Sequence, residues 1–116
     1  MNISMDIEVL KRMVSYCSDI CNAIKRFGAS FEALQTDKDY KNSVAMCILQ
    51  IGELTTHLTD DFKQTYKEMP WQDIKNMRNV AAHHYGKFDT TKLWETITED
   101  IPQLRDYCNE IIQNQN

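Results

Sequence analysis

An arginine, a histidine and a tyrosine stand close together in the C-terminal half of the chain, in the spacing Arg78-x4-His83-x-Tyr85. Arginine suits phosphate because its planar guanidinium donates two parallel hydrogen bonds to phosphate oxygens. Histidine suits proton transfer because its ordinary pKa lies near ~6.5. Metal-free cleavage of RNA needs a base that takes the proton of a ribose 2′-OH and a fixed positive charge on the phosphate. The segment therefore predicts phosphodiester chemistry.

The charge of the chain limits how such a site would bind nucleic acid. The formal net charge is −4, whereas neutralisation of phosphates supplies much of the affinity of nucleic-acid enzymes. Between residues 75 and 92 the local balance is nevertheless +3, because one acid, Asp89, accompanies four basic residues, Lys75, Arg78, Lys87 and Lys92. We expect modest, salt-sensitive binding and no extended basic groove.

Hydrophobic residues recur at three- and four-residue steps along the whole chain, which is typical of amphipathic α-helices. The first stripe comprises Ile7, Leu10, Val14, Cys17, Cys21 and Ile24. This helix is expected to end near Phe27 and Gly28, because glycine can adopt the left-handed conformation that closes many helices. Ser30 is expected to cap a short helical turn through Phe31 and Leu34.

The second long helix is expected to begin at Asp37 or Asp39. Its apolar stripe comprises Val44, Ile48, Ile51, Thr55 and Leu58. Gly52 lies inside this helix, where glycine costs about 1 kcal/mol relative to alanine, so close packing of another helix is the expected compensation. Two interpretations of Glu53 remain open: it is a buried partner of a motif side chain such as Arg78, or it lies on a solvated helix surface.

Pro70 predicts a break, after which a third helix carries the motif. Its packing face comprises Trp71, Ile74, Met77 and Ala81, and Gly86 is expected to end it. At about 100° per residue, Arg78 and His83 lie about 140° apart around a continuous helix. They converge only if the helix ends near His83, or if Arg78 reaches around the helix or across a dimer axis. Arg78 and Tyr85, seven residues apart, are nearly eclipsed.

The last apolar stripe predicts one long helix that starts after a cap at Asp89 or Thr90 and is kinked at Pro102. The stripe comprises Leu93, Ile97, Ile101, Leu104, Cys108 and Ile111. No alternating, strand-like run is found in the sequence. Four long helices with short connections predict an all-α fold, an up-and-down four-helix bundle with an additional short helix.

The length and composition are those of an ordinary folded protein. A chain of 116 residues with 42% hydrophobic and 26% charged residues fits a single domain over residues 1–116. The N-terminal segment carries acids where a signal peptide would carry bases, and no long apolar run follows it. We therefore expect a cytoplasmic protein with no membrane partner.

The cysteines and histidines predict neither a metal site nor a cofactor. The four cysteines, Cys17, Cys21, Cys47 and Cys108, form no C-x2-C pair and fall in phase with aliphatic residues, so we expect reduced thiols in the core. Of the three histidines, His57 is remote in sequence, and the adjacent His83 and His84 point in different directions from a helix.

Further segments around the motif resemble one known family. They are Ile51-Gly52-Glu53, Tyr66-Lys67-Glu68-Met69-Pro70-Trp71, Ile74-Lys75-Asn76-Met77-Arg78-Asn79, Trp94, and Glu99-Asp100-Ile101-Pro102. Together they are similar to the HepT-like branch of the HEPN superfamily, and the similarity extends over essentially the whole chain. The resemblance implies an all-helical homodimer. It also implies an RNase toxin of a type VII toxin–antitoxin pair, encoded beside a minimal nucleotidyltransferase antitoxin.

The resemblance also implies residue roles. Arg78 and His83 take the catalytic positions, and Tyr85 takes the position of a hydroxyl that accepts AMP from the antitoxin. Asn79, His84 and Glu53 are supporting candidates. Position 84 is histidine where the family often carries a small residue such as glycine, so which imidazole has which role stays open. RNA is the expected substrate, and no DNA partner is expected.

The mechanism that we hypothesise begins when His83 takes the proton of the 2′-OH while Arg78 holds the non-bridging phosphate oxygens. A cyclic phosphate forms as the 5′-oxygen leaves. The group that protonates the leaving oxygen stays open between His84, Tyr85, the second protomer's His83 and water. The alternative hypothesis is a non-catalytic helical module that binds the nucleotidyltransferase, its nucleotide or its substrate, with Tyr85 as a docking residue. A purely structural dimer is the third.

Overall fold

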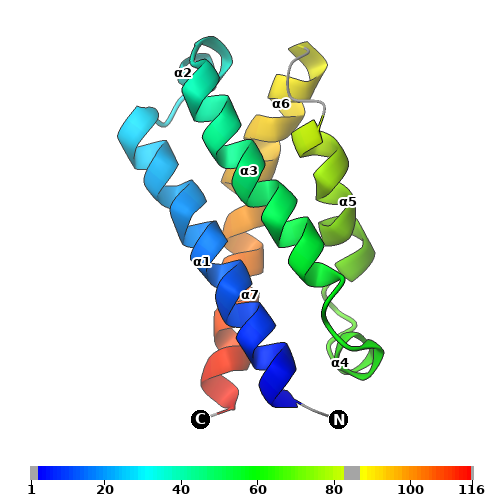
Figure 1. Cartoon of the computed structure of the whole chain (residues 1–116). Coiled ribbons are helices and arrows are strands. Elements are labelled where there is room, and N and C mark those ends of the chain that lie inside the picture. Colours follow the sequence, from blue (N-terminus) through cyan, green and yellow to red (C-terminus); the bar gives the residue numbers. More distant parts are fainter. Residues whose placement is uncertain (1–2, 83–86, 116) are drawn as a thin grey trace.

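A computed structural model describes residues 3–82 and 87–115 of the chain, and no strand occurs within these ranges (Figure 1). The elements in order are α1 (Ile3–Phe27), α2 (Phe31–Thr36), α3 (Lys38–Thr55), α4 (Asp60–Thr65), α5 (Trp71–Ala82), α6 (Lys87–Glu95), the π-helix η1 (Thr96–Asp100) and α7 (Ile101–Asn114). Among the described helices, none combines the length and the apolar character that crossing a membrane requires.

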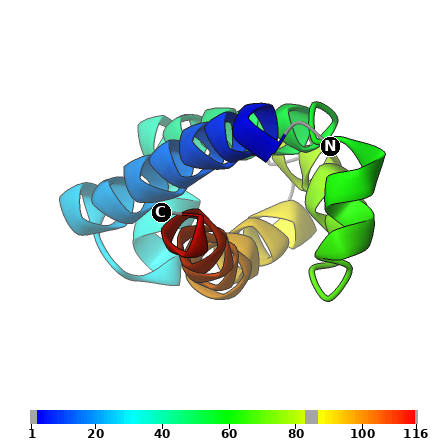
Figure 2. The same cartoon turned by 90° about the horizontal axis from the view of Figure 1, so that it is seen from below.

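The long helices run alternately up and down and pack side by side. In Figure 1, α1, α3 and α5 stand in a row and the continuous rod of α6, η1 and α7 passes behind them. The closest packing joins α3 to α5, α1 to α3 and α1 to α7. Figure 2, seen along the helices, shows α7 facing α1 across the bundle. The prediction of an all-α bundle is confirmed, although two short helices, α2 and α4, accompany the long ones.

The predicted helix ends before α3 are confirmed by their local geometry. Gly28 has φ +126°, the left-handed conformation that favours glycine, directly after α1. The Ser30 hydroxyl accepts a hydrogen bond from the Ala33 amide and caps α2. One carboxylate oxygen of Asp37 accepts from the amides of Asp39 and Tyr40, so Asp37 rather than Asp39 is the cap of α3. These contacts satisfy amides that the first helical turn leaves without partners.

Three of the four cysteines lie in the core, and one does not. Cys17, Cys47 and Cys108 are buried. Burial raises the pKa of Cys17 and of Cys108 to about 12 and that of Cys47 to about 11, so these thiols stay protonated at neutral pH. Cys21 is half-buried, and its sulfur accepts a hydrogen bond of 3.0 Å from Arg105. The prediction of core thiols is therefore wrong for Cys21, which lies at the edge of the α1–α7 contact.

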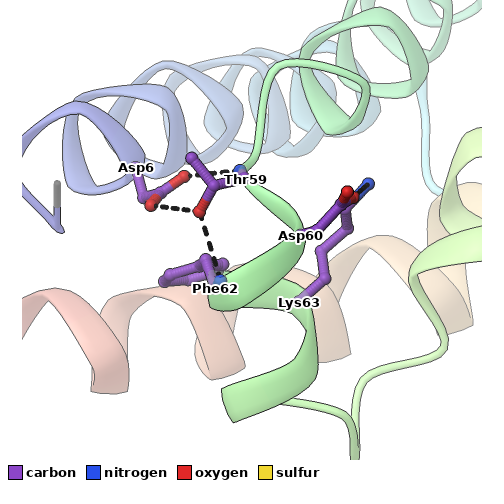
Figure 3. A network of polar contacts seen from close by, with 5 residues as sticks. All are labelled: Asp6, Thr59, Asp60, Phe62 and Lys63. Atoms are coloured by element: carbon purple, nitrogen blue, oxygen red, sulfur yellow. Dashed lines mark hydrogen bonds and ion pairs between the residues drawn. The ribbon is translucent and has the colours of Figure 1, made fainter. Parts of the chain in front are cut away.

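A buried carboxylate fastens α4, which the sequence did not predict as a helix, to the start of α1. Asp6 is fully buried. Its two oxygens accept hydrogen bonds from the Thr59 amide and the Thr59 hydroxyl, at 2.8 and 2.9 Å (Figure 3). The same hydroxyl accepts from the Phe62 amide and caps α4. This chain of contacts holds Phe62, which is also fully buried, against the core.

The predicted long C-terminal helix is continuous, but its irregularity differs from the predicted kink. The helix begins at Lys87, before the predicted caps at Asp89 and Thr90. The five residues Thr96–Asp100 form a π-helix, in which the Ile101 amide donates to the Thr96 carbonyl. Proline cannot donate, and its ring crowds the carbonyl four residues earlier. The wider turn directly before Pro102 accommodates that ring without ending the rod.

Candidate active site

The motif helix α5 is fixed in the bundle by one apolar face. Trp71, Ile74, Met77 and Ala81 are the buried residues of this helix, as the sequence predicts. The indole of Trp71 also donates a hydrogen bond of 3.0 Å to the Tyr66 carbonyl, which fixes the first turn of α5 after Pro70. Because Arg78 follows Met77 on this anchored helix, the position of its Cα is set by the core.

Gly52 of α3 leaves room for the side chain of Arg78. A β-carbon added at Gly52 would overlap Cγ of Arg78 and would lie 3.0 Å from Cδ of Arg78 and 3.2 Å from the Lys75 carbonyl oxygen. The aliphatic part of Arg78 therefore lies directly against the α3 backbone. The predicted compensation for glycine inside a helix, close packing against another helix, is confirmed. The contact partner, an arginine stem, is a detail that the sequence pattern did not reveal.

Glu53, the residue after Gly52, pairs with the guanidinium at the end of that stem. Oε1 of Glu53 and Nη1 of Arg78 form an ion pair between α3 and α5. The side chains are 55% and 35% exposed, respectively, so the pair lies at the surface, and Glu53 is not buried. Of the two interpretations, Glu53 is the partner of Arg78 while remaining in contact with solvent. Exposed ion pairs contribute only about 0–1 kcal/mol to stability.

The local arrangement determines which direction the guanidinium of Arg78 faces. Gly52 leaves space for the aliphatic part of Arg78, and Glu53 pairs with one nitrogen of its guanidinium. The guanidinium therefore lies at the α3–α5 surface and does not extend freely into solvent. Guanidinium carries five N–H groups in a fixed plane, so an ion pair at one nitrogen is compatible with hydrogen bonds from the others to a phosphate. Counting charges along residues 75–92 omitted Glu53, which offsets the charge of Arg78 from another helix.

The other predicted site residues are only partly within the described ranges. Asn79 is exposed on α5. His83, His84 and Tyr85 lie outside the described residues, as does Gly86, so the predicted end of the motif helix and the meeting of Arg78 with His83 remain predictions. Lys92 belongs to the basic segment 75–92; its ammonium lies 4.0 Å from a carboxylate oxygen of Glu95, and its side chain is 59% exposed.

Comparison with known proteins adds a second line of evidence. The family model described as Ribonuclease HepT-like matches residues 9–111. A protein of Thermococcus cleftensis named "Probable ribonuclease HepT" is 34% identical over 95 residues, which cover 78% of this chain and 86% of that protein. Proteins named "Putative RNase" from Caldanaerobacter subterraneus and Methanocaldococcus jannaschii are each 28% identical and cover 91% and 88% of this chain, and 93% and 86% of their own lengths. No solved structure matches the chain significantly.

Proposed function

Because the chain belongs to the Ribonuclease HepT-like family, we propose that it is an endoribonuclease that cleaves RNA without a metal ion. The observation that carries the proposal is the presentation of Arg78, which lies over Gly52 and is held by Glu53 at the α3–α5 surface. The glycine lets the arginine stem lie directly against the α3 backbone. A cation that must meet a phosphate in one geometry benefits from both neighbours, because catalysis depends on preorganised charge.

In the proposed reaction, the nucleophile is supplied by the RNA itself. His83 takes the proton of the 2′-OH, and the 2′-oxygen attacks the adjacent phosphorus. Arg78 donates hydrogen bonds to the non-bridging oxygens as their charge grows. The bond to the 5′-oxygen then breaks, and a 2′,3′-cyclic phosphate and a 5′-hydroxyl result. His84, Tyr85, the partner's His83 or water protonates the leaving oxygen.

Glu53 is a positioning residue in this proposal, because it acts on the substrate only through Arg78. Its carboxylate restricts the rotation of the guanidinium, whose long side chain otherwise loses about 2 kcal/mol of rotamer entropy when it is fixed. The same carboxylate reduces the positive potential that attracts RNA. Glu53 thus favours a correctly oriented cation at the expense of long-range attraction, in line with the modest binding expected of a chain with net charge −4.

The proposal includes a homodimer and a regulatory partner, a minimal nucleotidyltransferase antitoxin encoded nearby. In the regulatory step, the Tyr85 hydroxyl oxygen bonds to the α-phosphorus of ATP, pyrophosphate leaves, and the hydroxyl proton passes to solvent. The added phosphate is an anion seven residues from Arg78 along the chain. It would compete with RNA for that cation and would block entry to the site, so the modification is proposed as an off switch.

The test is cleavage of a labelled RNA by the purified chain in EDTA. We expect cyclic phosphate ends from the unaltered protein and loss of most cleavage in Arg78→Ala and in His83→Ala. Arg12→Ala, which removes an exposed arginine of α1, is the control for charge alone and is expected to keep its activity. Cleavage by Arg78→Ala and His83→Ala at the rate of the Arg12→Ala control would refute the assignments.

A second measurement separates catalysis from the structural role that the Glu53–Arg78 pair suggests. A surface ion pair contributes about 0–1 kcal/mol, so Arg78→Ala is expected to stay folded by circular dichroism. A non-catalytic module would cleave no RNA in any variant and would still bind the nucleotidyltransferase. Incubation with that enzyme and ATP, followed by mass spectrometry, tests whether Tyr85 gains one adenylate and whether cleavage then stops.

A further inference from the structure

The fourth side of the bundle is less tightly closed than the other three. Helix α3 packs along α5, and α1 packs along both α3 and α7. Between α5 and the rod formed by η1 and α7 lies a groove with a volume of about 540 Å³. This size is within the range of roughly 300–1,000 Å³ that is typical of binding pockets.

The groove lies on a different face of α5 from the one that carries Arg78. Asp73, Asn76, Met77 and Val80 line the groove, and their spacing of three and four residues places them on one side of the helix. Arg78 instead lies against Gly52 of α3. An occupant of the groove would therefore touch the motif helix without covering its arginine.

The base of the groove is apolar. Ile74 and Leu104 form part of its floor, and both are almost completely buried. Met69 and Val80 are half-buried and Pro70 is exposed, so apolar surface remains accessible along the wall. An occupant with apolar side chains would remove this surface from water.

The rim of the groove is acidic. The carboxylates of Glu68, Asp73 and Asp100 line it against one ammonium, that of Lys92. Glu68 is held in place by a hydrogen bond of 3.1 Å from the Tyr107 hydroxyl. Such a rim repels a polynucleotide, whose backbone is anionic, and attracts lysine and arginine side chains.

We propose that this groove is a docking site for a basic amphipathic helix of a partner protein, with its apolar side chains between α5 and α7 and its lysine or arginine residues on the carboxylate rim. The two walls are helices and the floor is apolar, which fits recognition of an amphipathic helix laid into a groove. A second copy of this chain fits less well, because its net charge of −4 repels an acidic rim. The proposal goes beyond RNA cleavage and does not depend on it.

The test uses a fluorescein-labelled peptide of leucine, alanine and lysine, about 14 residues or roughly four helical turns long, with leucine on one face and lysine on its flanks. Its affinity for the full chain is measured by fluorescence anisotropy. The double variant Asp73→Lys with Asp100→Lys is expected to bind at least about tenfold more weakly. It is also expected to bind a matched peptide with glutamate in place of lysine more tightly than the unaltered chain does.

The matched control is the double variant Glu8→Lys with Glu110→Lys, which makes the same change in net charge at exposed positions outside the groove. It is expected to bind the lysine peptide within about twofold of the unaltered chain. Methyl NMR spectra are expected to show shifts at Val80 and Leu104 on binding and none at Leu10, which is buried elsewhere.

Three outcomes would overturn the proposal. Equal weakening by both double variants would mean that the peptide responds only to net charge. Unchanged binding after every leucine of the peptide is replaced by serine would show that the apolar floor does not contribute to binding. Self-association of the chain that Asp73→Lys with Asp100→Lys abolishes, measured by light scattering, would assign the groove to a second copy. None of these readouts uses RNA cleavage, so the proposed nuclease activity stands or fails separately.

Discussion

The contact of Gly52 with Arg78 predicts an unusual response to the substitution Gly52→Ala. Alanine is favoured over glycine inside a helix by about 1 kcal/mol, so on helix propensity alone the substitution should stabilise α3. The added methyl group, however, overlaps Cγ of Arg78 and lies close to Cδ. Either the arginine stem moves or α3 and α5 separate.

The magnitude follows from these opposing terms. Overpacking between well-packed elements typically costs about 1–3 kcal/mol, so we expect Gly52→Ala to lower the free energy of unfolding by about 0–2 kcal/mol. In an Arg78→Ala background the overlapping atoms are absent. The Lys75 carbonyl, at 3.2 Å, still lies close, so the same substitution is expected to be neutral or to stabilise by up to about 1 kcal/mol. Because the propensity gain is the same in both backgrounds, the coupling between the two positions equals the cost of the overpacking, about 1–3 kcal/mol.

Urea denaturation followed by circular dichroism at 222 nm measures all four members of this double-mutant cycle. Ser43→Ala, at an exposed position of the same helix, is the control and is expected to change stability equally in both backgrounds. RNA cleavage by Gly52→Ala should fall towards that of Arg78→Ala, because the displaced stem carries the guanidinium away from Glu53. If Gly52→Ala stabilises the protein by the same amount with and without Arg78, the close contact that we describe is not present in solution.

Three further outcomes are expected. Asp6→Ala should lower the free energy of unfolding by about 2–3 kcal/mol, because a buried carboxylate that accepts two hydrogen bonds is lost; in urea titrations, a loss as small as that of the exposed control Glu8→Ala would contradict this. In the native state Cys21 should react first with a thiol reagent at pH 8, because burial raises the pKa of the other three thiols to about 11–12; four equal rates would be inconsistent with this. Glu53→Gln should keep more of kcat than Glu53→Ala, because the amide oxygen still accepts from Arg78, and its KM should be lower than that of the unaltered chain. Equal kcat values in the two variants would contradict the positioning role of Glu53.

The faces of α3, α5 and the last rod were predictable from the sequence because burial imposes a period of 3.6 residues. The face of α1 was predicted only in part: Met13, Ile20 and Ala23 are buried there, whereas Val14, Cys21 and Ile24 are only half-buried. The four apolar positions that begin at Trp71 are the buried positions of α5. The caps of α2 and α3 were predictable because Ser30 and Asp37 each satisfy amides a few residues away, whereas the last helix begins before its predicted caps. Gly52 indicated a close approach because a glycine inside a helix is otherwise unfavourable.

Contacts between distant segments were not predictable in the same way. Asp6 and Thr59 are 53 residues apart, and nothing in either local sequence identifies the other as its partner. The residue that fills the space above Gly52 depends on the register of α5 against α3, which the apolar period leaves undetermined. Glu53 was left between two interpretations for that reason, and each is right in part, because Glu53 pairs with Arg78 while remaining exposed to solvent.

The π-helix in the last rod has a consequence for how the length of this chain can change. Leu93, Ile97 and Ile101 are all fully buried, yet eight residues of a regular α-helix turn about 80° past two full turns. The wide turn of the π-helix takes up this excess rotation about the helix axis. Removing Glu99, an exposed residue of this segment, would leave seven, about 20° short of two turns. Both halves of the rod would keep their inward sides, but the loss of the wider turn would bring the ring of Pro102 against the carbonyl four residues earlier. Changes in length usually belong to loops, but here a one-residue deletion inside a helix would preserve the inward direction of the core residues on both sides of it.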